Sequence, residues 1–174
     1  GVVALEIVPE VVSAAREDFG DANRGLLADP RVTVEVDDGR HYLAAPPHAF
    51  EVVVGDLLVP WRPGEAALYT REHFAAARRA LTADGLFCQW LPVYQLSEEQ
   101  LRIVAATFVD VFPDTTLWRG NFLADQPILA LVAHLAEEER IDPEWVRFLP
   151  SAVGTRPAIP LPSSEKNEET ATVN

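Results

Sequence analysis

The feature that most constrains the fold is an apolar strand that stops at an acid, within the stretch FEVVVGDLLVPWRPGEAALYT at residues 50–70. Phe50–Val54 is rich in β-branched residues and is bounded by turn residues, a pattern typical of a buried strand. Asp56 follows directly after Gly55, where this strand should end. In open α/β sheets ligands bind at the carboxyl ends of the strands, so Asp56 is a candidate for chemistry.

Strands and helices alternate along most of the chain. Strands are predicted at Val2–Val8, Val32–Val36, Phe50–Val54, Leu86–Leu91, Thr115–Arg119 and Ile128–His134. Helices are predicted from Pro9 to Gly20, through His41–Ala45, over Arg71–Leu81 and from Ser97 to Phe112. This alternation predicts an α/β fold with a mainly parallel sheet and helices on both faces. The last two strands are close enough in sequence to pair antiparallel.

Turn and cap residues mark several boundaries. Thr70 is the predicted N-cap of the helix that follows it, and Ser97 with Gln100 three residues later has the pattern of a capping box. Asp84-Gly85 is expected to be the turn into the fourth strand, and Gly20 is expected to end the first helix.

Composition excludes several classes of function. The net charge is −13 and Lys166 is the only lysine, so a phosphate-tracking basic surface for nucleic acid is not expected. No apolar run approaches the ~20 residues that a membrane-spanning helix needs. The single cysteine, Cys88, cannot form an internal disulfide and is expected to be a buried structural thiol. The four histidines lack the spacing of a metal site, and none is predicted.

Three acids lie at or near the ends of three successive predicted strands, namely Glu6, Asp38 and Asp56. An unpaired carboxylate is costly to bury, so acids in such positions need a partner or a ligand. Glu6 is suited to accept hydrogen bonds from a ribose diol, and Asp38 from an adenine amino group. Asp56 would then face the group that reacts with the bound nucleoside. The alternative is that all three acids simply cap turns or helix N-termini.

Four ordered motifs resemble the spermidine synthase (polyamine aminopropyltransferase) family: VVALEIVPEVVSAAREDF, DPRVTVEVDDGRHYL, FEVVVGDLLVPWRPGEAALYTREHF and GLFCQW. The resemblance covers roughly residues 1–134 and is closest to synthase-like domains fused to transporter-like membrane segments. It implies a Rossmann-like S-adenosylmethionine-dependent methyltransferase fold, a mainly parallel sheet with an antiparallel last strand. The first strand and the Gly-rich loop of that fold are missing.

The resemblance also implies roles for individual residues. Glu6 matches the acid that binds the nucleoside ribose, Asp38-Gly39 the pair that reads the adenine, and Asp56 the general base that acts on the attacking amine. Tyr69 and Gln89 match positions near the substrate channel, with Tyr69 on the catalytic side and Gln89 on the cofactor side. The implied donor is decarboxylated S-adenosylmethionine, with no metal.

One position departs from the family pattern. The family loop usually reads Asp-x-x-Asp-Pro, and its second acid holds the far amine of putrescine. In this chain Val59 stands at that second position, so specificity for putrescine is not expected to follow from the resemblance.

Three functions therefore stay open: aminopropyl transfer to an amine in polyamine biosynthesis, methyl transfer from S-adenosylmethionine on the same scaffold, and a catalytically idle domain of a transporter-like membrane protein. Expected partners are a small amine acceptor and no nucleic acid. The resemblance is also compatible with a homodimer, and with a membrane segment upstream. The expected location is the cytoplasm, or the cytosolic side of a membrane.

The chain has no methionine and opens directly in an apolar run, which predicts that it is a fragment. We expect a partial catalytic domain at 1–134, a helical extension at 135–150 and a disordered tail at 151–174. The absent first strand would lie between the strands of Glu6 and Asp56, leaving two interior edges unpaired. The chain alone is therefore not expected to fold stably or to bind a nucleoside well.

Overall fold

The computed structural model describes residues 1–45, 49–120 and 127–135. The predicted helical extension and disordered tail, beyond residue 135, lie outside the described residues. In chain order the strands and α-helices are β1 (Val2–Glu6), α1 (Pro9–Glu17), β2 (Val32–Val36), α2 (Gly39–Ala44), β3 (Phe50–Gly55), α3 (Arg71–Ala80), β4 (Leu81–Leu91), α4 (Glu98–Val111), β5 (Thr115–Gly120) and β6 (Ile128–His134). Short 3₁₀ helices lie at Leu26–Ala28, Glu65–Tyr69 and Val93–Gln95.

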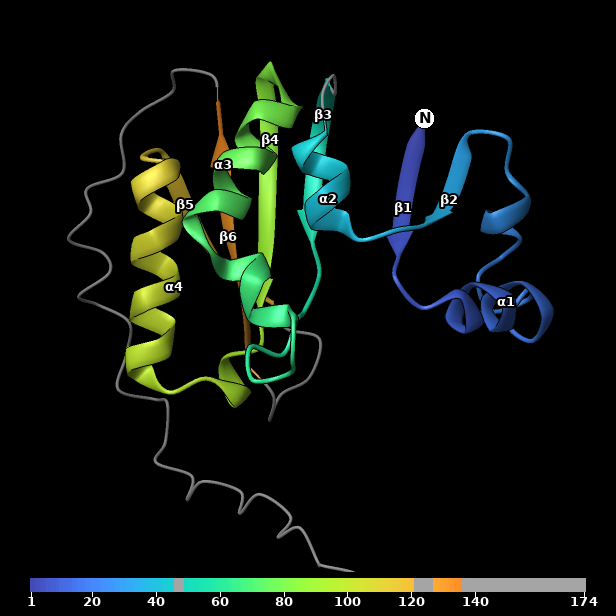
Figure 1. Cartoon of the computed structure of the whole chain (residues 1–174), viewed down its shortest axis with the longest axis horizontal. Coiled ribbons are helices and arrows are strands. Elements are labelled where there is room, and N and C mark those ends of the chain that lie inside the picture. The colour runs from blue at the N-terminus through green and yellow to red at the C-terminus, as the bar shows by residue number, and fades with distance from the viewer. Residues whose placement is uncertain (46–48, 121–126, 136–174) are drawn as a thin grey trace, which may run out of the picture.

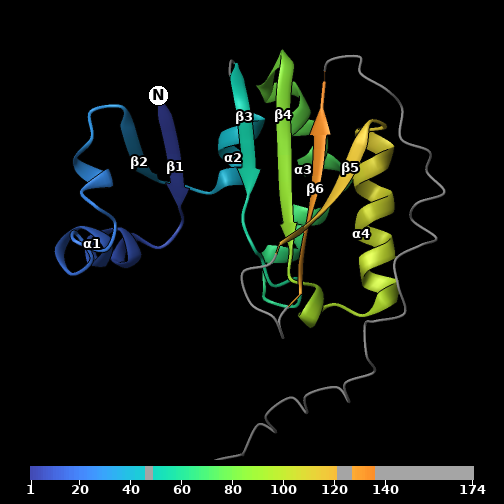
Figure 2. The ribbon, with the colours of Figure 1, turned by 180° about the vertical axis from the view of Figure 1, so that it is seen from behind.

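The strands form two sheets rather than one. β1 pairs with β2 in a two-stranded parallel sheet, and β3, β4, β6 and β5 form a four-stranded sheet in that order. β3 runs parallel to β4, whereas β6 runs antiparallel to both of its neighbours. β1 and β3 are the edges that face each other across the division (Figures 1 and 2). The mainly parallel α/β fold, the antiparallel β6 and the break between these two strands are all as predicted.

Helices α2, α3 and α4 lie on one face of the four-stranded sheet, as the two opposite views show (Figures 1 and 2). No described helix covers the other face of the four-stranded sheet, so the prediction of helices on both faces does not hold for this sheet. The side chains of Val52 and Val54 on that face are consequently exposed.

The main core fills the space between this sheet, α3 and α4. Its centre is a cluster of aromatic rings whose centroids lie 5.0 to 6.0 Å apart, formed by Phe74, Phe87, Phe108 and Phe112. All four are almost completely buried. This core packs against β4, and β4 pairs with the carboxyl end of β3.

The predicted caps are confirmed, and two boundaries are corrected. Thr70 accepts the His73 N–H, and the Ser97–Gln100 capping box is complete. However, β4 already begins at Leu81, because Leu81 pairs with Phe50 before the register shifts at Val52. The predicted Asp84-Gly85 turn is therefore an irregularity inside the strand.

The first helix also differs from its prediction. It ends at Glu17, so Gly20 lies beyond the helix instead of closing it. The short second helix begins at Gly39, two residues earlier than predicted, because Asp38 caps its N-terminus. Within the described ranges, no helix is long and apolar enough to cross a membrane.

Candidate active site

Asp56 lies immediately after β3, at the carboxyl end of the strand, as the sequence predicts. Its side chain is exposed, and Oδ1 accepts the backbone N–H of Leu57 at 2.7 Å. The other carboxylate oxygen makes no hydrogen bond to any described residue. The carboxylate is therefore held at one oxygen and available to a ligand at the other.

Two side chains of the 3₁₀ helix Glu65–Tyr69 bind the backbone of the loop that follows Asp56. The Tyr69 hydroxyl donates to the Leu58 carbonyl at 2.7 Å, and the Glu65 carboxylate accepts the Val59 N–H. Burial raises the pKa of Tyr69 to about 12, and the nearby carboxylates of Glu65 and Asp56 add to this effect. Tyr69 thus stays protonated at neutral pH and acts as a donor to the loop backbone.

Gln89 lies on β4, directly opposite Gly55. Its side chain is completely buried, and its Nε2 donates to the carbonyls of Asp56 at 3.2 Å and Trp90 at 3.1 Å. The structure therefore brings Tyr69 and Gln89 to the segment that carries Asp56, although Gln89, predicted on the cofactor side, is completely buried. Both side chains contact the backbone of this segment.

Glu6 and Asp38 both lie at the carboxyl end of the two-stranded sheet. Oε1 of Glu6 accepts the Val8 N–H at 2.8 Å, and the Glu6 carbonyl accepts the Asp37 N–H at 3.2 Å. This last bond ties the end of β1 to the turn that carries Asp38. Oε2 of Glu6 has no hydrogen-bond partner among the described residues, so one oxygen is open to a ligand.

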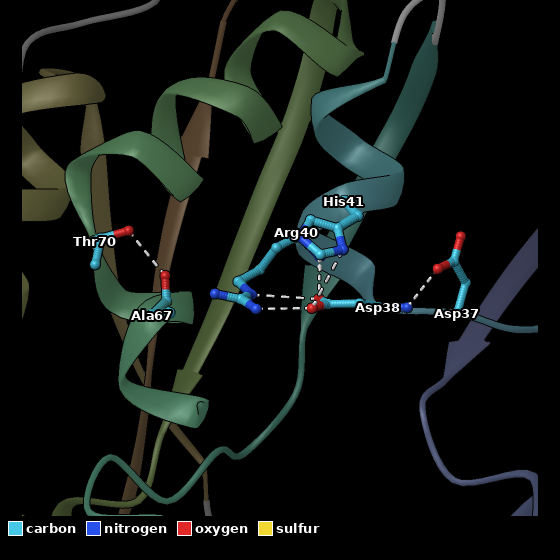
Figure 3. A network of polar contacts seen from close by, with 6 residues as sticks. All are labelled: Asp37, Asp38, Arg40, His41, Ala67 and Thr70. Atoms are coloured by element: carbon cyan, nitrogen blue, oxygen red, sulfur yellow. Dashed lines mark hydrogen bonds and ion pairs between the residues drawn. The ribbon is translucent and has the colours of Figure 1, made fainter. Parts of the chain in front are cut away.

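Asp38 is more heavily engaged than the sequence predicts. Its Oδ1 caps α2 by accepting the Arg40 N–H at 2.9 Å, and the Arg40 guanidinium binds Oδ2 at 2.8 Å (Figure 3). His41 lies 3.8 Å from the same oxygen. The hydrogen bond from Arg40 keeps the pKa of Asp38 below its usual value, so the carboxylate is charged at neutral pH. Gly39 opens the helix, and a Cβ there would lie 3.8 Å from Leu5.

Three side chains near these residues, Arg40, Glu65 and His73, were not predicted from the sequence. Of the three, only Arg40 could be recognised from a sequence pattern, because an Arg two residues after an N-cap Asp can bind its carboxylate. Glu65 and His73 carry no such pattern, because their roles depend on how the loop and α3 pack. His73 is buried on α3 beside the rings of Phe74 and Phe87.

The two groups of residues lie at the same end of the molecule, because β1 and β3 run in the same direction (Figure 2). One group offers fixed carboxylates suited to hydroxyl and amino donors of a nucleoside. The other offers an exposed carboxylate on a rigid support, suited to binding or deprotonating a cationic group. Across the described ranges, no three His, Cys, Asp or Glu side chains are grouped so that they could hold a metal ion.

Comparison with known proteins gives a consistent result. The family profile described as "Spermine/spermidine synthase domain" matches residues 2–118. A polyamine aminopropyltransferase of Mycobacterium tuberculosis is 41% identical over 88 residues, covering 49% of this chain and 17% of the relative. The corresponding protein of Hamiltonella defensa is 29% identical over 119 residues, covering 68% of this chain and 41% of the relative. The chain thus spans less than half the length of these relatives.

Solved structures agree with the fold. A spermidine synthase in complex with the transition-state analogue AdoDATO superposes with a TM-score of 0.69 and 23% identity, covering 83% of this chain and 50% of that one. Human methyltransferase-like protein 13 in complex with SAH superposes with a TM-score of 0.64 and 20% identity, covering 83% and 66%. At these identities the likeness concerns the fold.

Proposed function

The chain belongs to the spermine/spermidine synthase domain family, and from this premise we propose that it carries the site of an aminopropyltransferase. The donor would be decarboxylated S-adenosylmethionine, and the acceptor a small amine. The observation that carries the proposal is the exposed Asp56 carboxylate at the carboxyl end of β3, supported by the buried side chains of Tyr69 and Gln89. Solved proteins of this fold that hold AdoDATO or SAH support a ligand of this chemical kind.

In the proposed complex, Glu6 accepts hydrogen bonds from the ribose hydroxyls through its open oxygen. Asp38, next to Gly39, accepts a hydrogen bond from the adenine amino group. Both of its oxygens already accept from Arg40, but a carboxylate oxygen can accept a second hydrogen bond. Both carboxylates are preformed and need little rearrangement, which reduces the entropy lost on binding. The nucleoside then lies across the carboxyl ends of the strands, which is where ligands of such sheets bind.

Asp56 acts on the acceptor. An amine is protonated at neutral pH and has no free electron pair, so it must lose a proton before it attacks, and Asp56 is placed to accept that proton. The amine nitrogen then bonds to the carbon next to the sulfonium, the carbon–sulfur bond breaks, and its electron pair goes to sulfur. The sulfonium is a good leaving group, so the main task of the protein is to align the two reactants.

Val59 affects which acceptor amine the site can bind. Its side chain offers no charge, and its N–H is occupied by Glu65. A diamine would therefore lack an ion-pair partner at this position for its distal amine. We propose an acceptor that is less strongly cationic at its far end than putrescine. A homodimer, a cytoplasmic location and a membrane segment elsewhere in the whole protein also belong to this proposal.

The choice of donor tests this proposal against methyl transfer, which the same fold supports. Calorimetry with the natural full-length protein should show tighter binding of decarboxylated than of ordinary S-adenosylmethionine, and mass spectrometry should show the acceptor gaining an aminopropyl group. A gain of one methyl group from ordinary S-adenosylmethionine would favour the methyltransferase instead. Failure to bind either donor would contradict both enzymes and favour an idle domain.

A further inference from the structure

The contact between Gln89 and Asp56 extends the sheet beyond its last backbone pair. The registered pairing of β3 with β4 ends at Gly55 opposite Gln89. One residue further on, the Asp56 carbonyl is bound by the Gln89 side chain, whose Nε2 lies 3.2 Å away. The side-chain amide thus takes the place of the next backbone donor. This bond fixes the backbone of Asp56 at the point where the chain leaves the sheet.

Gly55 is the residue that makes this contact possible. A Cβ atom at position 55 would lie 2.3 Å from Oε1 of Gln89 and 2.9 Å from its Nε2, closer than non-bonded atoms approach. The amide therefore lies flat against the glycine. Because Gln89 is completely buried, a larger residue at position 55 would have to force the amide away from the Asp56 carbonyl.

The amide has only one workable orientation. Its Nε2 donates to two carbonyl oxygens, those of Asp56 and Trp90, while Oε1 is buried without a hydrogen-bond partner in the described part of the chain. Rotating the amide by half a turn would set Oε1 against both carbonyl oxygens. A buried carbonyl without a partner costs stability. A buried oxygen left without a partner next to a candidate catalytic residue calls for an explanation, and a functional role supplies one.

We infer that Gln89 is a positioning residue for Asp56, and that Gly55 and Gln89 form a matched pair in which the glycine makes room for the amide. The inference rests on the proposed function, because it takes Asp56 as the base. In this role Gln89 fixes the orientation of the Asp56 carboxylate and does not itself contact the reacting atoms. The pair should affect the rate of transfer and leave donor binding unchanged.

Three variants of the natural full-length protein test the pair. Gln89→Met keeps the volume and removes both donors and the unpartnered oxygen, and Gly55→Ala displaces the amide. Each should lower kcat by roughly 10- to 100-fold, the cost of a small misplacement, with an unchanged Kd for the donor. Gln89→Met loses two hydrogen bonds but also removes a buried oxygen without a partner, so these opposite effects should leave Tm little changed. Gln95→Met, on the 3₁₀ helix that follows β4, is the matched control and should leave kcat unchanged.

The double variant tests the pairing itself. In Gln89→Ala the amide is gone, so adding Gly55→Ala should lower kcat no further. An additive loss would contradict the matched pair. Unchanged kcat in Gln89→Met would overturn the positioning role, and so would a parallel loss of Tm and kcat in that variant, which would point to general destabilisation.

A spectroscopic measurement separates this inference from the proposed function. The Leu57 N–H donates to Oδ1 of Asp56, so its proton shift in a leucine-labelled sample reports where the carboxylate points. Gln89→Met and Gly55→Ala should both move this resonance, whereas Gln95→Met should not. If the wild-type protein transfers no aminopropyl group, the proposed function fails. In that case the Leu57 resonance alone decides on the positioning role, and a resonance that stays in place in both variants overturns it.

Discussion

His73 is a buried ionisable side chain. It lies beside the rings of Phe74 and Phe87 and is influenced by the charges of Arg40 and Asp38. Burial, assisted by the Arg40 cation, lowers its pKa to about 4, although Asp38 acts in the opposite direction. Its Nδ1 has no hydrogen-bond partner among the described residues. The imidazole is therefore neutral in the folded protein at neutral pH, and protonation would place an unpaired charge against the rings of Phe74 and Phe87.

This predicts a loss of stability between pH 6.5 and about 4. In this range the unfolded chain binds a proton at His73 and the folded chain does not, so the free energy of unfolding falls as the pH falls. The interval between the two pKa values corresponds to at most about 3 kcal/mol. Urea unfolding at pH 7.5 and 5 should show about 2 kcal/mol of this loss in the wild type, because pH 5 lies 1.5 units below the unfolded pKa. His73→Leu should lose much less over the same range, and an equal loss in both would refute a neutral buried His73.

The sequence predicts the acids of the site better than their partners. Asp56 and Asp38 follow apolar strands and Glu6 is the last residue of one, so strand ends alone are enough to locate them. Arg40 binds Asp38 through a contact only two residues away, which a pattern search could include. Glu65 reaches Val59 across a loop, and only the folded backbone reveals that contact.

At the scale of elements, the loop after β3 depends on one hydroxyl. Tyr69 is buried, and its hydroxyl holds the Leu58 carbonyl at 2.7 Å. Tyr69→Phe keeps the ring and removes this bond, so the free energy of unfolding should fall by about 0.5–1.5 kcal/mol. Chemical denaturation measures this change. Tyr94→Phe is the matched control, because Tyr94 is exposed, and it should change stability by less. Equal effects of the two substitutions would show that the Leu58 contact does not support the loop.

Helix α4 provides a second prediction at this scale. The Ser97 hydroxyl accepts the Gln100 N–H at 3.1 Å, and the Gln100 side chain accepts the Ser97 N–H at 2.8 Å. Ser97→Ala should lower the free energy of unfolding by about 1 kcal/mol. Ser97→Asp retains a capping oxygen and should recover most of that loss. Thermal unfolding of both variants checks the cap, and a loss of the same size in Ser97→Asp would contradict it.

Helix starts were predictable because their signals are local, as at Thr70 and Ser97. The start of β4 was not. Asp84-Gly85 has the composition of a turn, yet Leu81 finds a partner in Phe50 on another strand. Gly85 fits the resulting irregularity because a Cβ there would lie 2.8 Å from that of Leu81. Pairing between distant segments thus overrode the local turn signal.

At the scale of the whole molecule, the edges of β1 and β3 that face each other have no pairing strand among the described residues. Two-stranded sheets are marginally stable by themselves. β1 exposes Val2 and Val3, whereas Phe87 and Leu131 of the larger sheet are completely buried. The small sheet and the large sheet are therefore expected to differ in local stability.

Native-state hydrogen exchange of the 174-residue chain tests this expectation, and uniformly fast exchange in both sheets would mean that the chain alone does not fold stably, as its sequence predicts. Backbone amides of β1 and β2 should exchange at least 10-fold faster than those of β4 and β6, because the smaller sheet can open without disrupting the aromatic core. The amides of α4, which packs on that core, are the internal control and should be protected like those of β4. Equal protection in both sheets would show that the two sheets unfold as one cooperative unit.

The central claim, that Asp56 is the base of an aminopropyl transfer, is tested most directly by Asp56→Asn in the natural full-length protein. The amide keeps the shape of the side chain and can still accept the Leu57 N–H, but it cannot take a proton from an amine. We predict that transfer falls at least about 100-fold, within the range that a general base contributes, while the Kd of decarboxylated S-adenosylmethionine stays within about twofold. Transfer at the wild-type rate by Asp56→Asn would contradict the account.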